Sequence, residues 1–166
     1  MGLSNLGIFH TVIGVAAIIA ALVSFVRYGK IDFGSGEGKI YFYGTLVASL
    51  TALGIYRHGG FNAGHVLSLL IIVLILTGFF LHTKKSGNNK ARYFENFCLS
   101  FSFFLSMVPT INETLTRLPV GKPFASDVKD PIVMNSLSTA FILFIIGSGY
   151  QVVRQRKINK KAQSGS

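Results

Sequence analysis

The stretch RHGGFNAGH, residues 57–65, separates two long apolar runs and determines how the flanking chain can fold. Three of its nine residues are glycine, which lets a chain reverse direction sharply. Asn62 belongs to the residue types that cap the start of a helix. We therefore expect two antiparallel helices joined by a tight turn that carries two histidines, His58 and His65.

Apolar runs of similar length recur along the chain. The hydrocarbon core of a bilayer is about 30 Å thick and requires roughly 20 mostly apolar residues per helix. Half of the 166 residues are hydrophobic and only 13% are charged, about half the charged share of a soluble domain. We predict an all-α integral membrane bundle of five transmembrane helices, with the lipid bilayer as its partner. The helices are expected at about 8–28, 39–57, 64–82, 93–117 and 131–153, in one domain over 1–153, followed by a disordered basic cytoplasmic tail at 154–166.

The basic residues predict the orientation of this bundle. Five spans place twelve of the 16 Lys and Arg residues on one side and four on the other. Cytoplasmic connections are enriched in Lys and Arg, so the N-terminus is expected outside and the C-terminus inside. The net charge of +10 is accounted for by this distribution, and we predict no nucleic-acid partner. The expected location is the bacterial inner membrane.

Small residues predict which helices pack closely, because helix contacts in lipid favour residues that let backbones approach. Segments one, two and five carry such residues at helical spacing. We expect these three segments to pack together and segments three and four to expose more surface to lipid. Representative small residues are Gly14, Ala17, Gly44, Ala48, Ala140, Gly147 and Gly149.

Four side chains that can ligate a metal lie at the predicted outer level: His10, His58, His65 and Glu113. Imidazole and carboxylate groups bind iron, zinc or copper, and histidines from different helices can also ligate a haem. Arg57 and Arg117 lie at the same level as supporting polar residues. These residues predict a haem b or transition-metal site with a redox or sensing role.

Two other functions remain open. Interfacial histidines also serve as membrane anchors and Glu113 can simply pair with Arg117, which would make the chain a non-enzymatic structural or assembly protein. A metal-activated water at the same cluster would make it a membrane hydrolase. The sequence assigns no catalytic residue, and it is compatible with a homo-oligomer or another membrane protein as partner.

The segments FHTVIGV, GKIYFYGTLVASLTALGIYRHGGFNAGHVLSLL and NETLTRLP resemble a class of small bacterial membrane proteins of unknown function. The resemblance covers roughly residues 8–120 and implies a multi-pass topology without implying a chemistry. Its matching positions are His10, His58, His65, Glu113, Arg117 and Pro119. The chain also shows a weaker similarity to membrane cytochrome b-type bundles, from which it departs because it lacks paired histidines at both membrane faces.

Overall fold

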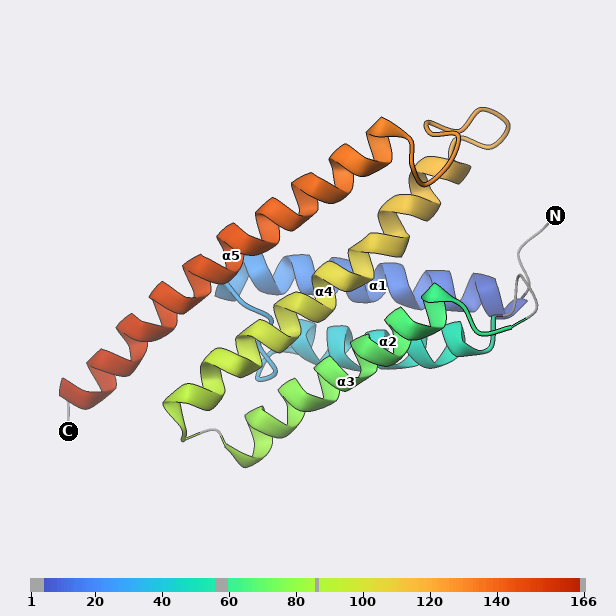
Figure 1. The fold of residues 1–166 in the computed structure, drawn as a ribbon. Coiled ribbons are helices and arrows are strands. Elements are labelled where there is room, and N and C mark those ends of the chain that lie inside the picture. Colours follow the sequence, from blue (N-terminus) through green and yellow to red (C-terminus); the bar gives the residue numbers. More distant parts are fainter. Residues whose placement is uncertain (1–4, 56–59, 86, 165–166) are drawn as a thin grey trace.

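A computed structural model describes residues 5–55, 60–85 and 87–164 and confirms the all-helical fold (Figure 1). The helices are α1 (Asn5–Tyr28), α2 (Gly36–Leu53), α3 (Ala63–Lys84), α4 (Asn89–Arg117) and α5 (Pro131–Ser164). No strand occurs among the described residues. Successive helices run in opposite directions, so the two ends of the chain lie at opposite ends of the molecule.

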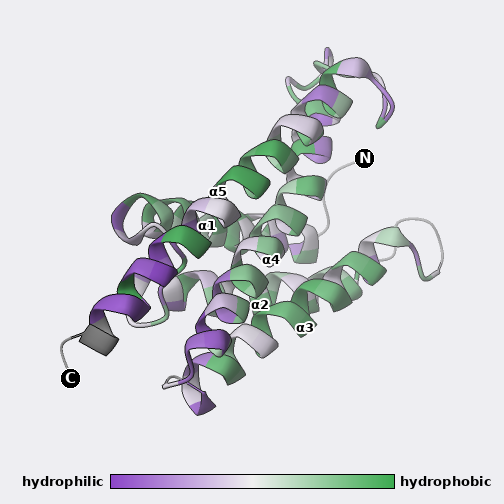
Figure 2. Cartoon of the chain, turned by 60° about the vertical axis from the view of Figure 1, so that its left-hand side comes forward, coloured by the Kyte–Doolittle hydropathy of each residue, from purple (hydrophilic) through white to green (hydrophobic). Residues whose placement is uncertain are grey.

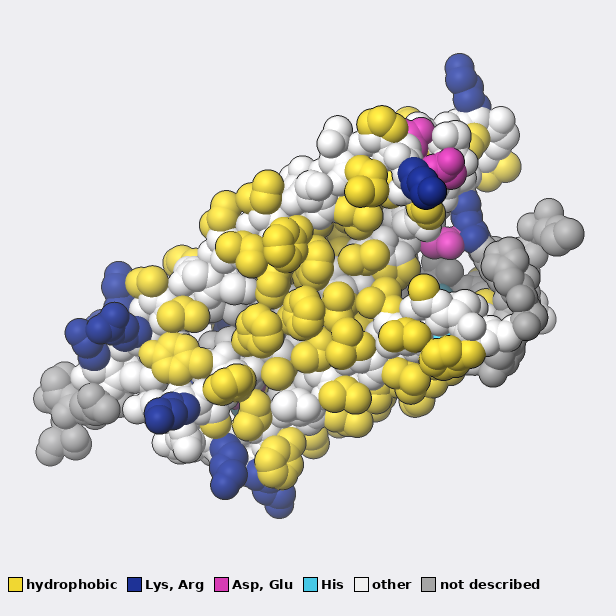
Figure 3. All heavy atoms as spheres, viewed as in Figure 1, with side chains coloured by type: hydrophobic (Ala, Val, Ile, Leu, Met, Phe, Trp, Pro, Cys, Tyr) yellow, Lys and Arg dark blue, Asp and Glu magenta, His cyan; other side chains and the backbone are white. Residues whose placement is uncertain are grey.

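Four helices, α1, α3, α4 and α5, are long and apolar enough to cross a membrane when the described residues are searched. Their apolar residues form a continuous zone along the middle of the molecule, while polar residues concentrate toward its ends (Figure 2). The face in Figure 3 shows the same apolar zone between two groups of charged side chains. These features support a multi-pass membrane protein in contact with lipid.

The two ends of the bundle differ in charge. We call the end where α1, α3 and α5 finish the basic end, because it carries twelve of the Lys and Arg residues. The opposite end, where α1 and α3 begin and α4 finishes, is called the N-terminal end. In Figure 3 the basic end carries most of the visible Lys and Arg side chains.

Local polar side chains define where the helices begin. The Ser35 hydroxyl accepts a hydrogen bond from the Gly38 N–H and so caps α2. The Asn88 side chain accepts from two backbone N–H groups at the start of α4. Asp130 accepts from the Ile132 N–H next to Pro131, where the sequence predicts the start of the fifth helix. These contacts satisfy backbone donors that a helix start leaves unpaired.

The pairing of helices differs from the expectation drawn from small residues. The structure packs α1 against α2, α2 against α3, α3 against α4, and α4 against α5, and in the described residues α5 packs on no other helix. A Cβ at Gly147 or Gly149 would meet no neighbouring atom within 4 Å. Phenylalanine rings supply the α4–α5 contact instead, since Phe144 lies 5.5 Å from Phe101 and 5.3 Å from Phe104 between ring centroids.

The basic tail also differs from its expectation. α5 continues to Ser164, so residues 154–164 are helical where a disordered tail is predicted. Gln151, Gln155 and Asn159 recur at intervals of four residues, which places them on one helical stripe. The Gln155 amide donates to the Asn159 side chain at 2.8 Å, and Asn159 approaches the Tyr93 hydroxyl of α4 at 3.5 Å. Gln151 and Asn159 thus give α5 polar contacts with α4 at the basic end, through Ser100 and Tyr93.

Candidate functional site

At the N-terminal end, His10 joins α1 to α2. Its Nδ1 lies 2.9 Å from the Ala48 carbonyl oxygen and 3.3 Å from the Thr51 hydroxyl oxygen. A carbonyl oxygen only accepts, so Nδ1 carries the proton and donates. In the neutral ring the Nε2 lone pair then remains as an acceptor. His10 is half-buried and faces its neighbouring helix.

His65 has a different role at the start of α3. Its Nδ1 accepts a hydrogen bond from the Asn62 N–H at 3.2 Å, and the Asn62 side chain in turn caps the helix. A backbone N–H only donates, so Nδ1 is unprotonated and a neutral His65 carries its proton on Nε2. His65 is buried, at 3% exposure. This capping contact occupies the lone pair through which Nδ1 could otherwise bind a metal.

The remaining predicted site residues are less constrained. Glu113 forms an i,i+4 ion pair with Arg117 on the exposed face of α4, as one alternative predicted. Arg57 and His58 lie outside the described residues. Within the described residues, no group of three or more His, Cys, Asp or Glu side chains is arranged to hold a metal ion. The four-residue outer site therefore stays a prediction.

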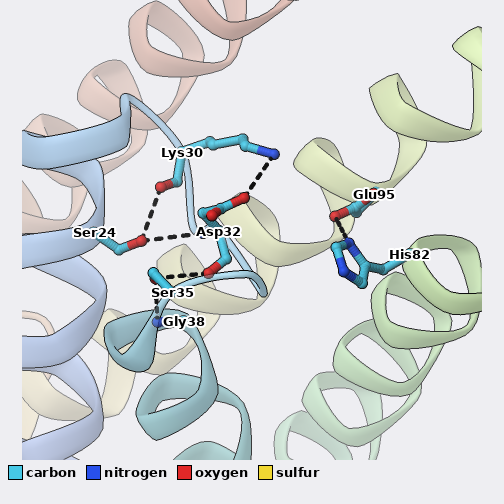
Figure 4. A network of polar contacts seen from close by, with 7 residues as sticks. All are labelled: Ser24, Lys30, Asp32, Ser35, Gly38, His82 and Glu95. Carbon is cyan, nitrogen blue, oxygen red and sulfur yellow. Dashed lines mark hydrogen bonds and ion pairs between the residues drawn. The ribbon is translucent and has the colours of Figure 1, made fainter. Parts of the chain in front are cut away.

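The residues at the N-terminal end form one polar layer. A second polar layer lies at the basic end and includes the contact between His82 and Glu95 (Figure 4). His82 Nδ1 lies 2.9 Å from Glu95 Oε1. The Glu95 side chain is only 4% exposed, whereas that of His82 is 36% exposed. The Phe33 ring packs against the His82 imidazole at 5.1 Å between centroids. The imidazole thus connects a buried carboxylate on α4 with the connection between α1 and α2.

That connection, residues 29–35, is fixed by local hydrogen bonds (Figure 4). The Ser24 hydroxyl donates to the Lys30 carbonyl and accepts from the Asp32 N–H, each at 3.0 Å. The Lys30 ammonium pairs with the Asp32 carboxylate at 3.1 Å. The Ser35 hydroxyl donates to the Asp32 carbonyl at 2.7 Å. This network positions Lys30 and Asp32 beside α4 and α5.

Buried amides complete the layer where α4 meets α5. The Ser100 hydroxyl donates to the Gln151 Oε1 at 2.9 Å, with both side chains buried. Asn96 and Gln155 are buried as well, at 6% and 4% exposure. A cavity of about 180 Å³ opens between residues 28–32, α4 and α5. Its polar lining residues are Lys30, Asp32, Asn96, Gln151, Arg154 and Gln155.

This layer is not among the sites predicted above, although the sequence carries a signal for it. Glu95 and Asn96 immediately follow Phe94, inside a predicted membrane span. The spacing of Gln151 and Gln155 also places two amides on one face of the last helix. Polar residues inside membrane-spanning segments are costly unless they find partners, so these positions identify where the helices must contact one another.

Comparison of the chain with known protein families, with curated proteins and with solved structures found no match. The functional assignment therefore depends on the geometry of the two polar layers.

Proposed function

We propose that this chain is a five-span protein of the bacterial inner membrane, with its N-terminus outside and its C-terminus inside. The 18 residues of α2 extend for about 27 Å at 1.5 Å per residue, close to the thickness of a bilayer core. α2 packs between α1 and α3, which supports its role as the fifth span. The concentration of Lys and Arg at the basic end supports the orientation.

Reporter fusions test this topology. A reporter joined after Ser166 should be active only in the cytoplasm, and one inserted at Gly121, between α4 and α5, only outside. Cytoplasmic activity at both positions would contradict an odd number of spans between them and require a different arrangement of α5. Activity reversed at both positions would contradict the orientation alone.

Within that topology, the function best supported is a non-enzymatic one, in which polar side chains hold the bundle together. The hydrogen bond from His10 to Ala48 carries this proposal, because it uses a histidine of the predicted outer site to join two helices. A hydrogen bond of this kind contributes about 1 kcal/mol. The capping role of His65 and the pair of Glu113 with Arg117 follow the same principle.

Stability measurements test the structural role of His10. Substituting His10→Ala should lower the free energy of unfolding in detergent micelles by about 1 kcal/mol. Val12→Ala is the matched control, because Val12 lies in the same turn of α1 and is 63% exposed. An equal loss in both variants would mean that the His10 contacts have no specific structural role.

Haem or metal binding at the N-terminal end is the second candidate. Histidines that ligate metals commonly donate their other ring N–H to a carbonyl oxygen, and His10 donates Nδ1–H to the Ala48 carbonyl. The visible spectrum and metal content of the purified full chain distinguish the two candidates. A colourless, metal-free protein supports the structural role. A Soret band, or stoichiometric metal that is lost in His10→Ala, supports the ligand site.

A further inference from the structure

The cavity at the basic end combines one unmatched cation with buried amide groups. Lys30 and Arg154 contribute two positive charges to its lining and Asp32 contributes one negative charge, so the net charge is +1. Lys30 is already paired with Asp32 at 3.1 Å. Arg154 is half-buried and forms no ion pair with any acidic residue in the described chain. Removing a cation from water without a partner costs free energy. A bound anion would offset this cost for the Arg154 guanidinium.

Gly29 brings the Arg154 guanidinium close to the backbone of the α1–α2 connection. Gly29 has a φ of +66°, and a Cβ at this position would collide with the guanidinium and touch the Tyr150 ring. Only glycine combines that backbone conformation with such a close approach. The turn therefore places the guanidinium at the wall of the cavity rather than in open solvent.

Neutral hydrogen-bond donors lie around the same cavity. Asn96 is 6% exposed and lines the cavity, where its side-chain amide can donate a hydrogen bond to a bound group. Gln151 accepts from Ser100 through Oε1, which leaves its amide N–H groups as donors that this bond does not use. Amide donors beside a guanidinium are a combination that recognises oxyanions.

From this arrangement we propose that the cavity binds a phosphate group, carried either by an anionic phospholipid or by a soluble phosphate ester. Arginine presents a planar fork of donors that matches phosphate oxygens in a bidentate manner. The cavity of about 180 Å³ is far larger than a single water requires. It lies where the apolar part of α1 ends, at Tyr28 and Lys30, which is the level expected for lipid phosphates. The lipid form of the proposal rests on the membrane topology proposed above.

Thermal unfolding of the purified full chain tests the proposal. One sample contains phosphatidylcholine nanodiscs, a second contains nanodiscs with added phosphatidylglycerol, and a third receives inorganic phosphate in phosphatidylcholine nanodiscs. A ligand that binds only the folded state raises the unfolding midpoint. Stabilisation by phosphatidylglycerol alone identifies a lipid site, and stabilisation by inorganic phosphate identifies a site open to soluble phosphate. No stabilisation by either probe would overturn the proposal.

Matched variants separate the cavity from general attraction to negative charge. Arg154→Gln should weaken the apparent affinity for the stabilising probe by about ten- to a hundredfold, the usual weight of a hydrogen bond to a charged group. Arg156→Gln removes the same charge two residues away, at an exposed position outside the cavity, and should leave the affinity within about twofold. Equal losses in the two variants would reduce the effect to surface electrostatics and overturn the proposal.

Two further variants keep the proposal testable if Arg154→Gln does not fold. Arg154→Lys retains the charge without the planar fork and should keep part of the affinity. Asn96→Ala retains both cations and should weaken binding by removing a neutral donor. Wild-type affinity in both Arg154→Lys and Asn96→Ala would contradict recognition inside the cavity. These affinities are measured independently of the metal and reporter experiments. A failure of the proposed function can therefore be told apart from a failure of phosphate binding.

Discussion

His82 Nδ1 and Glu95 Oε1 lie 2.9 Å apart, and this contact ties the last turn of α3 to the second turn of α4. Only a short connection separates the two helices in the chain, so the contact closes a helical hairpin at the basic end. The Phe33 ring adds the α1–α2 connection to the same cluster. The cluster around this polar pair thus links α3, α4 and the α1–α2 connection.

A double-mutant cycle measures how strongly His82 and Glu95 are coupled. Residues that share a hydrogen bond usually show interaction free energies of about 0.5–3 kcal/mol. We expect Glu95→Ala and His82→Ala each to destabilise the folded state, and the double variant to lose less than the sum of the two. Unfolding in detergent micelles supplies the four free energies. Strict additivity would show that the two side chains contribute independently.

At Gly38, near the start of α2, the neighbouring backbone leaves no room for a side chain. A Cβ at Gly38 would overlap the carbonyl oxygen of Asp32, whereas a Cβ at Gly36 would meet nothing within 4 Å. Gly38→Ala must displace the connection that positions Lys30 and Asp32, at a cost of about 1–3 kcal/mol. Gly36→Ala should leave the free energy of unfolding equal or slightly higher, because alanine favours helix. Equal effects of the two substitutions would contradict the tight contact at Gly38.

Acid should weaken the start of α5. The N–H of Ile132, then the N–H and hydroxyl of Ser126, donate to Asp130 and lower the pKa of its carboxyl below the usual value. A lowered pKa contributes stability that is present above the unfolded value, near 3.9, and is lost as the pH falls through the folded value. Once the intrinsic pH dependence of amide exchange is divided out, the protection factors of the amides at the α5 start should therefore fall below about pH 4.

Asp130→Asn provides the control for this effect. Asparagine also caps helices, so the variant should resemble the wild type at neutral pH. Its protection factors at the start of α5 should then change little in acid. An equal loss of protection in both proteins would assign the acid sensitivity to another group.

Tyr41 is predicted to stabilise the centre of the bundle through its hydroxyl. The Tyr41 and Ser102 hydroxyl oxygens lie 2.7 Å apart, and both side chains are fully buried. Tyr41→Phe should therefore cost about 1 kcal/mol of unfolding free energy. Tyr43, which is 60% exposed on the same helix, offers the matched control, and Tyr43→Phe should change stability by much less. Similar losses would show that the buried bond adds nothing.

The sequence predicts the helices of this protein better than the contacts between them. Apolar length and end signals such as Asn62 and Pro131 act locally, so the starts of α3 and α5 follow directly from them. Helix pairing depends on side-chain shape across the interface. The stripe containing Gly147 therefore misidentifies the neighbours of α5, which the Phe144 ring contacts determine.

Polar contacts between distant parts of the chain are equally hard to predict. Glu95 lies in an apolar segment and contacts a histidine in another helix, a relationship that local spacing does not reveal. His10 does face its neighbouring helix, as its position on a stripe of small residues suggests. Its hydrogen-bond partner is a backbone carbonyl, however, and any sequence provides such a group at every position.

The length of α5 sets the distance over which its charges act. Lys160 follows Arg154 by six residues in a continuous helix, which corresponds to about 9 Å along the axis at 1.5 Å per residue. The Debye length at physiological ionic strength is about 8 Å. A flexible tail could let these cations return to the lipid surface, but a rigid helix holds Lys160 about one screening length from Arg154. Salt therefore weakens the electrostatic coupling between Arg154 and Lys160 without abolishing it.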